Sequence, residues 1–395
     1  MTPVVNPNHI LALDRQDRLR SVMKQRGVPA LLTSDPINIL YACGARNMTV
    51  FGMMGPSRFV LVFADGPVIL YEFAGCEHLV ESLPTVDDVR PAPGITANSG
   101  DNHHRYGAEF AAQVISECRS MLGGSIDLAV ERVDFAFTDA LRSEGAQLHD
   151  ATAVFLEARN IKTATEVSAM YQAIERVDQA VAVMESAIFD GLPEVQIWAA
   201  FHHQLIASEG EYVSTRLLQG GPNTFPYFNE AGPRPIRDTE LLCLDTDAIG
   251  YRGYAVDFSR TFLCGDQPPS PEQRNLYGLA HEQLQHNASL LAPGLSYEAF
   301  ARQAWAVPDT FAPYGYYCLA HGIGLCGQHP NVPLYRMGQP YQLPGQFEAG
   351  MTVCVESYIG CPDSRQGVKL EDQYLITPDG AERMTTYPFD DRLLG

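Results

Sequence analysis

The stretch LLCLDTDAIGYRGYAVDFSRTFLC, residues 241–264, decides the predicted fold of the second half of the chain. Two apolar runs flank a turn at residues 251–253, and three aspartates interrupt them. Asp245 and Asp247 are two residues apart, so on a strand both point to the same face. A hairpin folded about Arg252 places Asp247 opposite Asp257, with Cβ atoms about 4.5–5.5 Å apart. Like charges this close need a cation, and the Leu, Cys, Val and Phe neighbours favour a cation site over a solvated acidic surface.

Two further stretches supply matching metal-ligand types. His321 in LAHGIGLCGQHP precedes Gly-x-Gly, a pattern that keeps the backbone tight and leaves room for approach. A second hairpin, VCVESYIG-CPDSRQG-VKLEDQYLI, pairs Glu356 with Glu371 when folded about its loop. Alone, His321 could equally be a hydrogen-bonded core histidine. With five carboxylates it forms an oxygen-plus-imidazole set that suits Mn, Fe, Co or Zn, and two ions balance five negative charges better than one.

Composition narrows the classes of function. The 395 residues are 46% hydrophobic, enough for two domains with cores of their own. A net charge of −20 and a pI near 4.9 argue against nucleic acid or an anionic membrane as partner. The first twenty residues contain no apolar leader, and no run has the length of a membrane span. Nine cysteines without a CxxC pair indicate reduced thiols, so we expect a cytoplasmic protein.

Residues 1–155 alternate helical and strand patterns and predict an α/β domain. The expected strands are 30–33, 37–41, 59–63, 68–73 and 126–130, with a hairpin turn at Asp65-Gly66. The expected helices are 10–29, 106–120 and 135–143. His103 and His104 are adjacent and face opposite ways, so we interpret them as exposed residues of a polar loop, 94–105, rather than as metal ligands.

Residues 156–395 predict a second domain that contains both hairpins. The expected helices are 166–189, 193–208, 270–291 and 296–305, the third opened by the capping residues Ser270 and Gln273. A strand is expected at 212–218. A loop rich in Gly and Pro follows it and carries Phe225, Tyr227 and Phe228.

With these motifs the chain resembles the pita-bread metallopeptidase superfamily, which includes aminopeptidase P, prolidase, methionine aminopeptidase and creatinase. The order Asp, Asp, His, Glu, Glu and the segment ARNIKTATEVSAM carry the resemblance. It implies an α+β protein: an N-terminal creatinase-like α/β domain (1–155) and a C-terminal pita-bread catalytic domain of mostly antiparallel sheet plus helices (156–395). It also implies a homodimer. The chain departs from the superfamily in the separation of its aspartates. Asp247 and Asp257 are ten residues apart and Asp245 and Asp257 are twelve apart, whereas the superfamily's usual separation lies between these two values.

The DTD variant is similar to a narrower branch, the dimethylsulfoniopropionate (DMSP) lyases, as are the segments STRLLQGGPNTFPYFNEAGPR, CLAHGIGLC and YPFDDRLLG. That branch cleaves a C–S bond by β-elimination, and all three aspartates bind metal in it. The resemblance therefore implies six ligands to two divalent ions (Fe, Mn, Zn or Co): Asp245, Asp247, Asp257, His321, Glu356 and Glu371.

The sequence departs from both groups at residues that move protons. The histidines of the peptidases are replaced by Tyr227-Phe228 and by Gln328, so aminopeptidase activity is not expected. The proposed base of the lyases, an Asp after the Cys of HGxGLC, is replaced by Gly327. Tyr227 and His329 stand where the lyase pocket has tryptophans.

The first functional hypothesis is a DMSP-lyase-like enzyme for a small polar substrate, with aromatic side chains that face the sulfonium. Its catalytic candidates are His329, whose ordinary pKa of about 6.5 suits a base, and Tyr316, which matches a tyrosine of the lyase pocket. The alternative is a metal-dependent hydrolase of a small amide, amine or Xaa-Pro-type peptide, in which metal-bound hydroxide attacks and no Asp is needed at 327. A binding protein without catalysis is the third hypothesis.

Overall fold

The computed structural model describes residues 7–94, 97–124, 126–335 and 342–395. The chain divides into two compact units, Met1–Arg159 and Asn160–Gly395. Each unit has its own hydrophobic core. None of the helices among the described residues combines the length and the apolar character needed to cross a bilayer.

The first unit is built on a mixed six-stranded sheet with the order β4-β3-β2-β1-β5-β6. The central strand β1 pairs antiparallel with β2 and parallel with β5, and β3–β4 and β5–β6 are also parallel pairs. The strand bounds are β1 Ala30–Thr33, β2 Phe59–Phe63, β3 Val68–Glu72, β4 Asp88–Pro91, β5 Ile126–Glu131 and β6 Ala146–Asp150.

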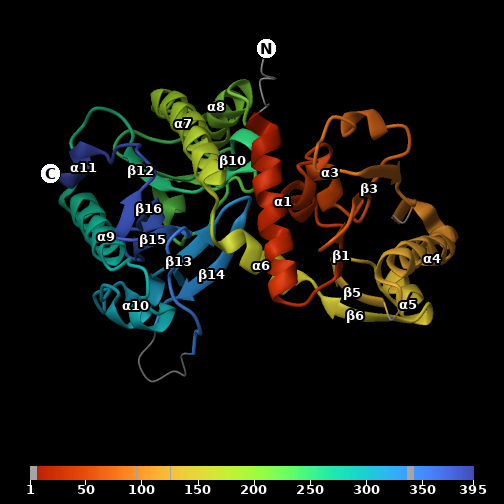
Figure 1. Cartoon of the computed structure of the whole chain (residues 1–395). Coiled ribbons are helices and arrows are strands. Elements are labelled where there is room, and N and C mark those ends of the chain that lie inside the picture. Colours follow the sequence, from red (N-terminus) through yellow and green to blue (C-terminus); the bar gives the residue numbers. More distant parts are fainter. Residues whose placement is uncertain (1–6, 95–96, 125, 336–341) are drawn as a thin grey trace, which may run out of the picture. The chain divides into compact units, whose positions relative to one another are not determined.

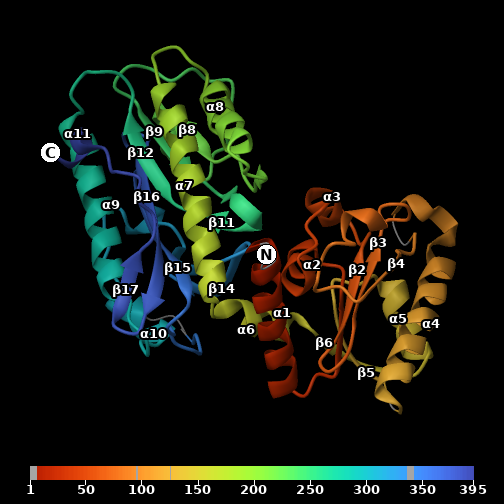
Figure 2. The same cartoon turned by 45° about the horizontal axis from the view of Figure 1, so that its top comes forward.

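Helices cover both faces of this sheet, with α4 and α5 on one face and α1 and α2 on the other (Figure 2). Alternate strand side chains such as Phe59 and Leu61 pack with Phe110 of α4 and Phe137 of α5. The helix bounds are α1 Pro7–Gln25, α2 Pro36–Cys43, α3 Thr49–Met53, α4 His103–Leu122, α5 Phe135–Ser143 and α6 Thr152–Asn160, with short 3-10 turns η1 Glu77–Leu79 and η2 Ala97–Asn102.

Two predictions for this unit were wrong. Residues 37–41 form part of helix α2 instead of a strand, because Asp35 caps the backbone N–H groups of Ile37 and Asn38 and Pro36 occupies the first helical turn. His103 and His104 begin helix α4 instead of lying in a loop, and His103 Nε2 lies 3.0 Å from Asp134 Oδ1. Residues 95–96 of the expected loop lie outside the described residues.

Among its described residues the second unit has three antiparallel sheets, with the orders β14-β13-β15-β16-β17, β12-β9-β8 and β11-β10-β7. Their strands are β7 Tyr212–Val213, β8 Leu218–Gly220, β9 Leu241–Asp245, β10 Ala248–Ile249, β11 Ala255–Val256, β12 Ser259–Leu263, β13 Cys318–Ile323, β14 Gly327–Pro333, β15 Thr352–Cys361, β16 Gln366–Thr377 and β17 Gly380–Arg383. The prediction of a mostly antiparallel unit with helices is confirmed.

Helix α9 lies along strands β15 and β16, as the two views of the fold show (Figures 1 and 2). Apolar residues on alternate strand positions, including Val355 and Leu370, pack in the core shared with α9. Because side chains alternate along a strand, Glu356 and Glu371 project from the opposite face. The helices are α7 Ala164–Ser186, α8 Glu194–Ala207, α9 Pro271–Ser289, α10 Tyr297–Gln303 and α11 Asp391–Leu394, with 3-10 turns η3 Gly221–Thr224, η4 Tyr251–Gly253 and η5 Ala312–Tyr314.

Both predicted hairpin registers are confirmed. Glu356 pairs with Glu371, and Asp245 pairs with Ser259, as a fold about Arg252 requires. The first hairpin is not one continuous ladder, however: it passes from the β9/β12 sheet into the β10/β11 sheet at Thr246 and Asp247. The Thr246 hydroxyl bridges the change by donating to Val256 O and accepting from Phe258 N–H.

The predicted strand 212–218 is split into β7 and β8, which belong to different sheets. Between them the chain turns toward the first hairpin, where Ser214 N–H donates to Asp247 O. The Thr215 hydroxyl donates to Asp247 Oδ2 at 2.6 Å. The interruption therefore places a hydroxyl beside one of the predicted ligands.

Candidate metal centre and active site

The second unit brings all six predicted ligands onto one region of its sheets. Asp245 ends β9, and Asp247 and Asp257 lie in the breaks of the first hairpin. His321, Glu356 and Glu371 lie on the adjacent strands β13, β15 and β16. Five of the six line one cavity, and Glu371 is fully buried beneath it.

His321 is the centre of the tightest group. Its Nε2 lies 3.6 Å from Asp257 Oδ2, 3.4 Å from Glu356 Oε1 and 3.5 Å from Glu371 Oε1. Burial alone would lower the pKa of His321, but the nearby carboxylates of Glu356 and Glu371 raise that pKa well above the ordinary value. These separations are close to those between two ligands of one metal ion, whose bonds to N and O ligands are about 2.0–2.2 Å long.

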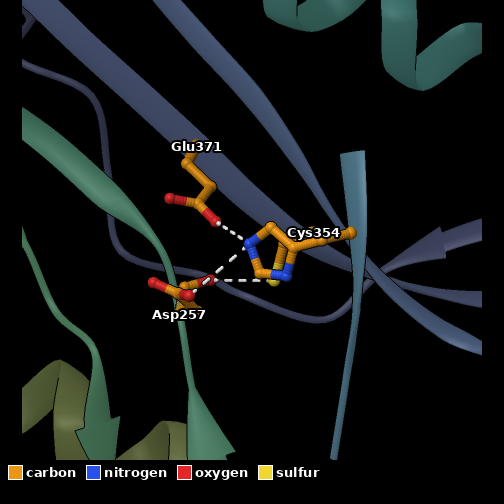
Figure 3. Close-up of side chains that lie close together, drawn as sticks. Asp257, Cys354 and Glu371 are labelled. Atoms are coloured by element: carbon orange, nitrogen blue, oxygen red, sulfur yellow. Dashed lines mark hydrogen bonds and ion pairs between the residues drawn. The ribbon is translucent and has the colours of Figure 1, made fainter. Parts of the chain in front are cut away.

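Cys354 joins this group, although the sequence reasoning did not select it. Ligand atoms of Asp257, His321, Cys354 and Glu371 all lie within 4.8 Å of one another, and Figure 3 shows the two carboxylates and the cysteine together. Asp257 Oδ1 and Glu371 Oε1 are buried without a hydrogen-bond partner among the described residues. Buried acceptors with no donor are costly, so this donor set fits a metal cation.

Asp245 and Asp247 are held by hydroxyl groups on the other side of the cluster. Tyr227 OH donates to Asp245 Oδ2 at 2.7 Å, and Ser259 Oγ lies 2.9 Å from Asp245 Oδ1. The same Ser259 hydroxyl lies 2.9 Å from Glu371 Oε2. Ser259 thus links the aspartates of the first hairpin to the glutamate of the second.

The crowded carboxylates do not share their charge equally in the metal-free chain. Burial, and then repulsion by Asp245, raises the pKa of Asp247 from 3.8 to about 7. Burial and the charge of Glu371 raise the pKa of Asp257 well above its ordinary value. Burial would also raise the pKa of Glu371, but the charges of Lys369 and His321 hold it below the ordinary value. A metal that binds here therefore displaces protons from the two aspartates.

Lys369 is another residue that the sequence reasoning missed. Its Nζ lies 2.5 Å from Glu356 Oε2, 2.8 Å from Glu371 Oε2 and 3.4 Å from Asp245 Oδ2. Burial alone would lower the pKa of Lys369, but these carboxylates hold it well above the ordinary value. The cluster thus contains a fixed positive charge.

The same cavity, about 610 Å³ in volume, also receives Tyr316, Gly327 and His329. Phe228, Tyr316 and Tyr317 form an aromatic wall, with the Tyr316 ring centroid 5.4 Å from that of Phe228 and 4.8 Å from that of Tyr317. The His329 ring packs edge-on against Tyr297. Tyr316, Gly327 and His329, three of the residues singled out by comparison with the lyases, therefore line the same cavity as the predicted ligands.

The residues that were missed share one sequence signal. Ser259, Cys354 and Lys369 each lie two positions from a predicted ligand within or beside a strand. That spacing directs their side chains to the ligand face. A search for polar residues at this spacing would have found all three.

Comparisons with known proteins define the class. The sequence profile of metallopeptidase family M24 matches residues 168–378, and that of the creatinase/prolidase N-terminal domain matches residues 15–161. The chain therefore belongs to metallopeptidase family M24, with a creatinase-like N-terminal domain and a C-terminal pita-bread domain. The predicted family and fold class are confirmed, and the protein is a member of a superfamily of enzymes that use divalent metals.

Within this family the chain is similar over nearly its whole length to DMSP lyases. It is 33% identical to dimethylsulfoniopropionate lyase DddP of Roseovarius nubinhibens over 96% of this chain and 87% of that protein. It is 34% identical to the DddP of Roseobacter denitrificans over the same shares. Among solved structures, the Xaa-Pro dipeptidase from Bacillus anthracis superposes with a TM-score of 0.77 at 21% identity, over 96% of this chain and 99% of that one.

Proposed function

We propose that the protein is a two-metal lyase that acts, as a homodimer, on a small carboxylate carrying a cationic leaving group, with DMSP as the reference substrate. The observation that carries this proposal is the cavity in which the predicted ligands face the aromatic wall of Phe228, Tyr316 and Tyr317. The similarity to two DddP lyases over nearly the whole chain supports the same class of reaction.

The cavity is suited to a zwitterionic substrate. None of the described residues that line it is lysine or arginine. The ammonium of Lys369 lies 5.6 Å from the Tyr316 ring centroid, but it is buried and paired with Glu356 and Glu371. Aromatic faces attract such a head group by about 0.5–2 kcal/mol each when it is desolvated. The aromatic wall therefore takes the cationic end, and the substrate carboxylate is left for the metal centre.

Two divalent ions from the set Fe, Mn, Zn and Co fit the donor atoms. Asp257, His321, Glu356 and Glu371 would hold one ion, and Asp245 and Asp247, with carboxylates shared from the first group, would hold the other. When bound, the ions bind the substrate carboxylate and make its α-proton more acidic.

Elimination requires a base beside the cavity. The base takes the α-proton, the C–H electron pair becomes the C=C bond, and the C–S pair leaves with the sulfur as a neutral thioether. We assign this role to His329, because burial lowers its pKa below 6.5 and keeps the imidazole neutral at pH 7. Tyr316 is the second candidate. Burial and the charge of Glu356 raise its pKa well above the ordinary value, so its hydroxyl keeps its proton in the metal-free chain and cannot accept another group's proton there.

Replacing His329 by alanine is expected to lower the turnover of DMSP about 100-fold, the typical contribution of a general base. The rate of the native protein should rise with pH below 6.5 and then level off, because only the neutral imidazole accepts a proton. This acidic limb should vanish in the His329 variant. A double variant that carries His329→Ala and Tyr316→Phe tests both candidates together. Undiminished turnover of DMSP by this variant would show that neither residue has the assigned role.

Hydrolysis of an Xaa-Pro-type peptide or a small amide is the second candidate function. The observation that favours it is the glycine at 327, because hydrolysis does not need the aspartate that the resemblance to the lyases implies there. We expect the metal-loaded native protein to release dimethyl sulfide from DMSP slowly, measured in the headspace, and to leave a panel of Xaa-Pro dipeptides intact. Rapid dipeptide cleavage without dimethyl sulfide would replace the lyase proposal by the hydrolase one.

A further inference from the structure

Lys369 has no part in the proposed reaction, yet it lies at the centre of the carboxylate cluster. It stands two residues before Glu371 on β16, so its side chain projects from the ligand face of the strand. It is fully buried, whereas lysine is almost never fully buried unless it is paired. Its four polar neighbours are Ser259, Glu356, Glu371 and Asp245. The ammonium of Lys369 is therefore buried and held by residues of both hairpins, as an integral part of the carboxylate cluster.

The two glutamates divide their oxygens between Lys369 and His321. Glu356 Oε2 and Glu371 Oε2 lie 2.5 and 2.8 Å from the ammonium. Their Oε1 atoms face the imidazole at 3.4 and 3.5 Å. Lys369 therefore fixes the rotation of both carboxylates, and the oxygen that remains on each is directed toward the metal position beside His321.

Charge gives the lysine a second role. Five ionised carboxylates would repel one another in the metal-free chain, and the Lys369 ammonium lies beside Glu356 and Glu371 as a counter-charge. His321 also faces both glutamates, but its imidazole must be neutral to bind a metal, whereas the ammonium keeps its charge when metal binds. With Lys369 charged, the cluster carries four negative charges, and two divalent cations supply four positive ones. Without it the two ions would leave one negative charge uncompensated.

We propose that Lys369 is a built-in cation that assembles the carboxylate cluster before metal arrives and sets its charge to the value that two divalent ions neutralise. This inference rests on the metal centre of the proposed function and is independent of the substrate. It makes Lys369 a positioning residue, which acts through Glu356, Glu371 and Asp245.

The test compares melting temperatures of metal-free and Mn-loaded protein for the native chain and for Lys369→Met, with metal content measured by elemental analysis. Methionine keeps the length of the side chain and removes its charge and its donors. The metal-free variant is expected to melt about 10 °C lower than the metal-free native chain, because buried carboxylates lose their partner. The melting temperature of the Mn-loaded variant should lie much closer to that of the Mn-loaded native chain, because the ions compensate the same carboxylate charges. Equal falls in both forms would overturn the proposal.

Arg58→Met is the matched control. Arg58 is a buried cation of the first unit, with Nη2 2.6 Å from Glu72 Oε2, whereas the predicted ligands all belong to the second unit. Its loss should lower the melting temperature of both forms by the same amount. A larger fall of the metal-free form in this control as well would show that the difference does not report on Lys369, and would overturn the inference.

Two further variants decide the case if Lys369→Met does not accumulate. Lys369→Arg keeps the charge, and Lys369→Gln keeps a donor without the charge. The measured quantity is the difference in melting temperature between the metal-free and Mn-loaded forms. The proposal is supported if this difference equals that of the native chain in the arginine variant but not in the glutamine variant. The same result in both variants overturns it. Failure of the lyase proposal would be seen only in turnover, which these measurements do not use. A native chain that melts alike with and without Mn would overturn the metal centre and this inference together.

Discussion

Replacing Gly327 by aspartate is expected to raise the rate of dimethyl sulfide release from DMSP about 100-fold. Gly327 begins β14 and lines the same cavity as His321 and Glu356. It occupies the position after the Cys of HGxGLC, where the resemblance to the lyases implies the base. A carboxylate there would add a second proton acceptor beside the metal centre.

The local structure has room for this change. A Cβ at Gly327 would meet no atom within 4 Å, whereas a Cβ at Gly322 would lie 2.1 Å from His329 O. Gly322 is thus required for the close approach of β13 and β14, and Gly327 is not. The substitution should therefore leave the fold and the melting temperature almost unchanged.

Gly327→Asn is the matched control, because asparagine has the shape of aspartate without a basic carboxylate. Headspace detection of dimethyl sulfide from equal amounts of metal-loaded protein compares the three chains. The prediction requires a gain with aspartate and none with asparagine. Equal rates for the native chain and the aspartate variant, at equal metal content, would mean that the lyase base lies elsewhere or that the cavity does not accept DMSP.

The hairpins were predictable from the sequence because strand periodicity is strict. A fold about Arg252 and a fold about the 361–367 loop each set one register, and in both cases the structure has that register. Side chains with an even spacing then had to share a face, so the predicted ligands converge. The local pattern was sufficient because the antiparallel pairing across each hairpin is itself local.

Contacts between distant segments were not predictable in the same way. The spacing of two residues from Glu371 indicates that Lys369 lies on the ligand face, but its contacts with Ser259 and Asp245 of the first hairpin depend on how the two hairpins pack. The break in the first hairpin depends on Ser214 and Thr215, more than thirty residues upstream of Asp247. In contrast, the error at 37–41 was local: the Asp35-Pro36 capping signal was present in the sequence and outweighs the apolar run that follows it.

Removing metal is expected to lower the melting temperature by about 10 °C or more. An ion present at a thousand times its dissociation constant stabilises the folded state by about 4 kcal/mol, and each kcal/mol shifts the melting temperature of a domain of this size by about 2–4 °C. The unpartnered oxygens of Asp257 and Glu371 are the atoms that gain most from a cation. Calorimetry with chelator, and then with Mn, Fe, Co or Zn added back, measures the loss and the recovery.

The loss should grow with pH. An unfolded aspartate releases its proton near pH 3.9, whereas Asp247 in the metal-free folded chain holds its proton to about pH 7. In that window the folded state binds more protons than the unfolded one, so the stability of the metal-free chain falls as pH rises. His321 acts in the same direction above pH 6.5, because its pKa is raised in the folded chain.

Bound metal displaces these protons, so the metal-loaded chain should not show the same decline. The difference in melting temperature between the two forms is therefore expected to be larger at pH 8 than at pH 5. Asp247→Asn is the control, because it removes one of the titrating groups and should flatten the pH dependence of the metal-free form. A difference between the forms that is constant from pH 5 to pH 8 would contradict the raised pKa values on which this prediction depends. No change on adding chelator at either pH would contradict the metal centre itself.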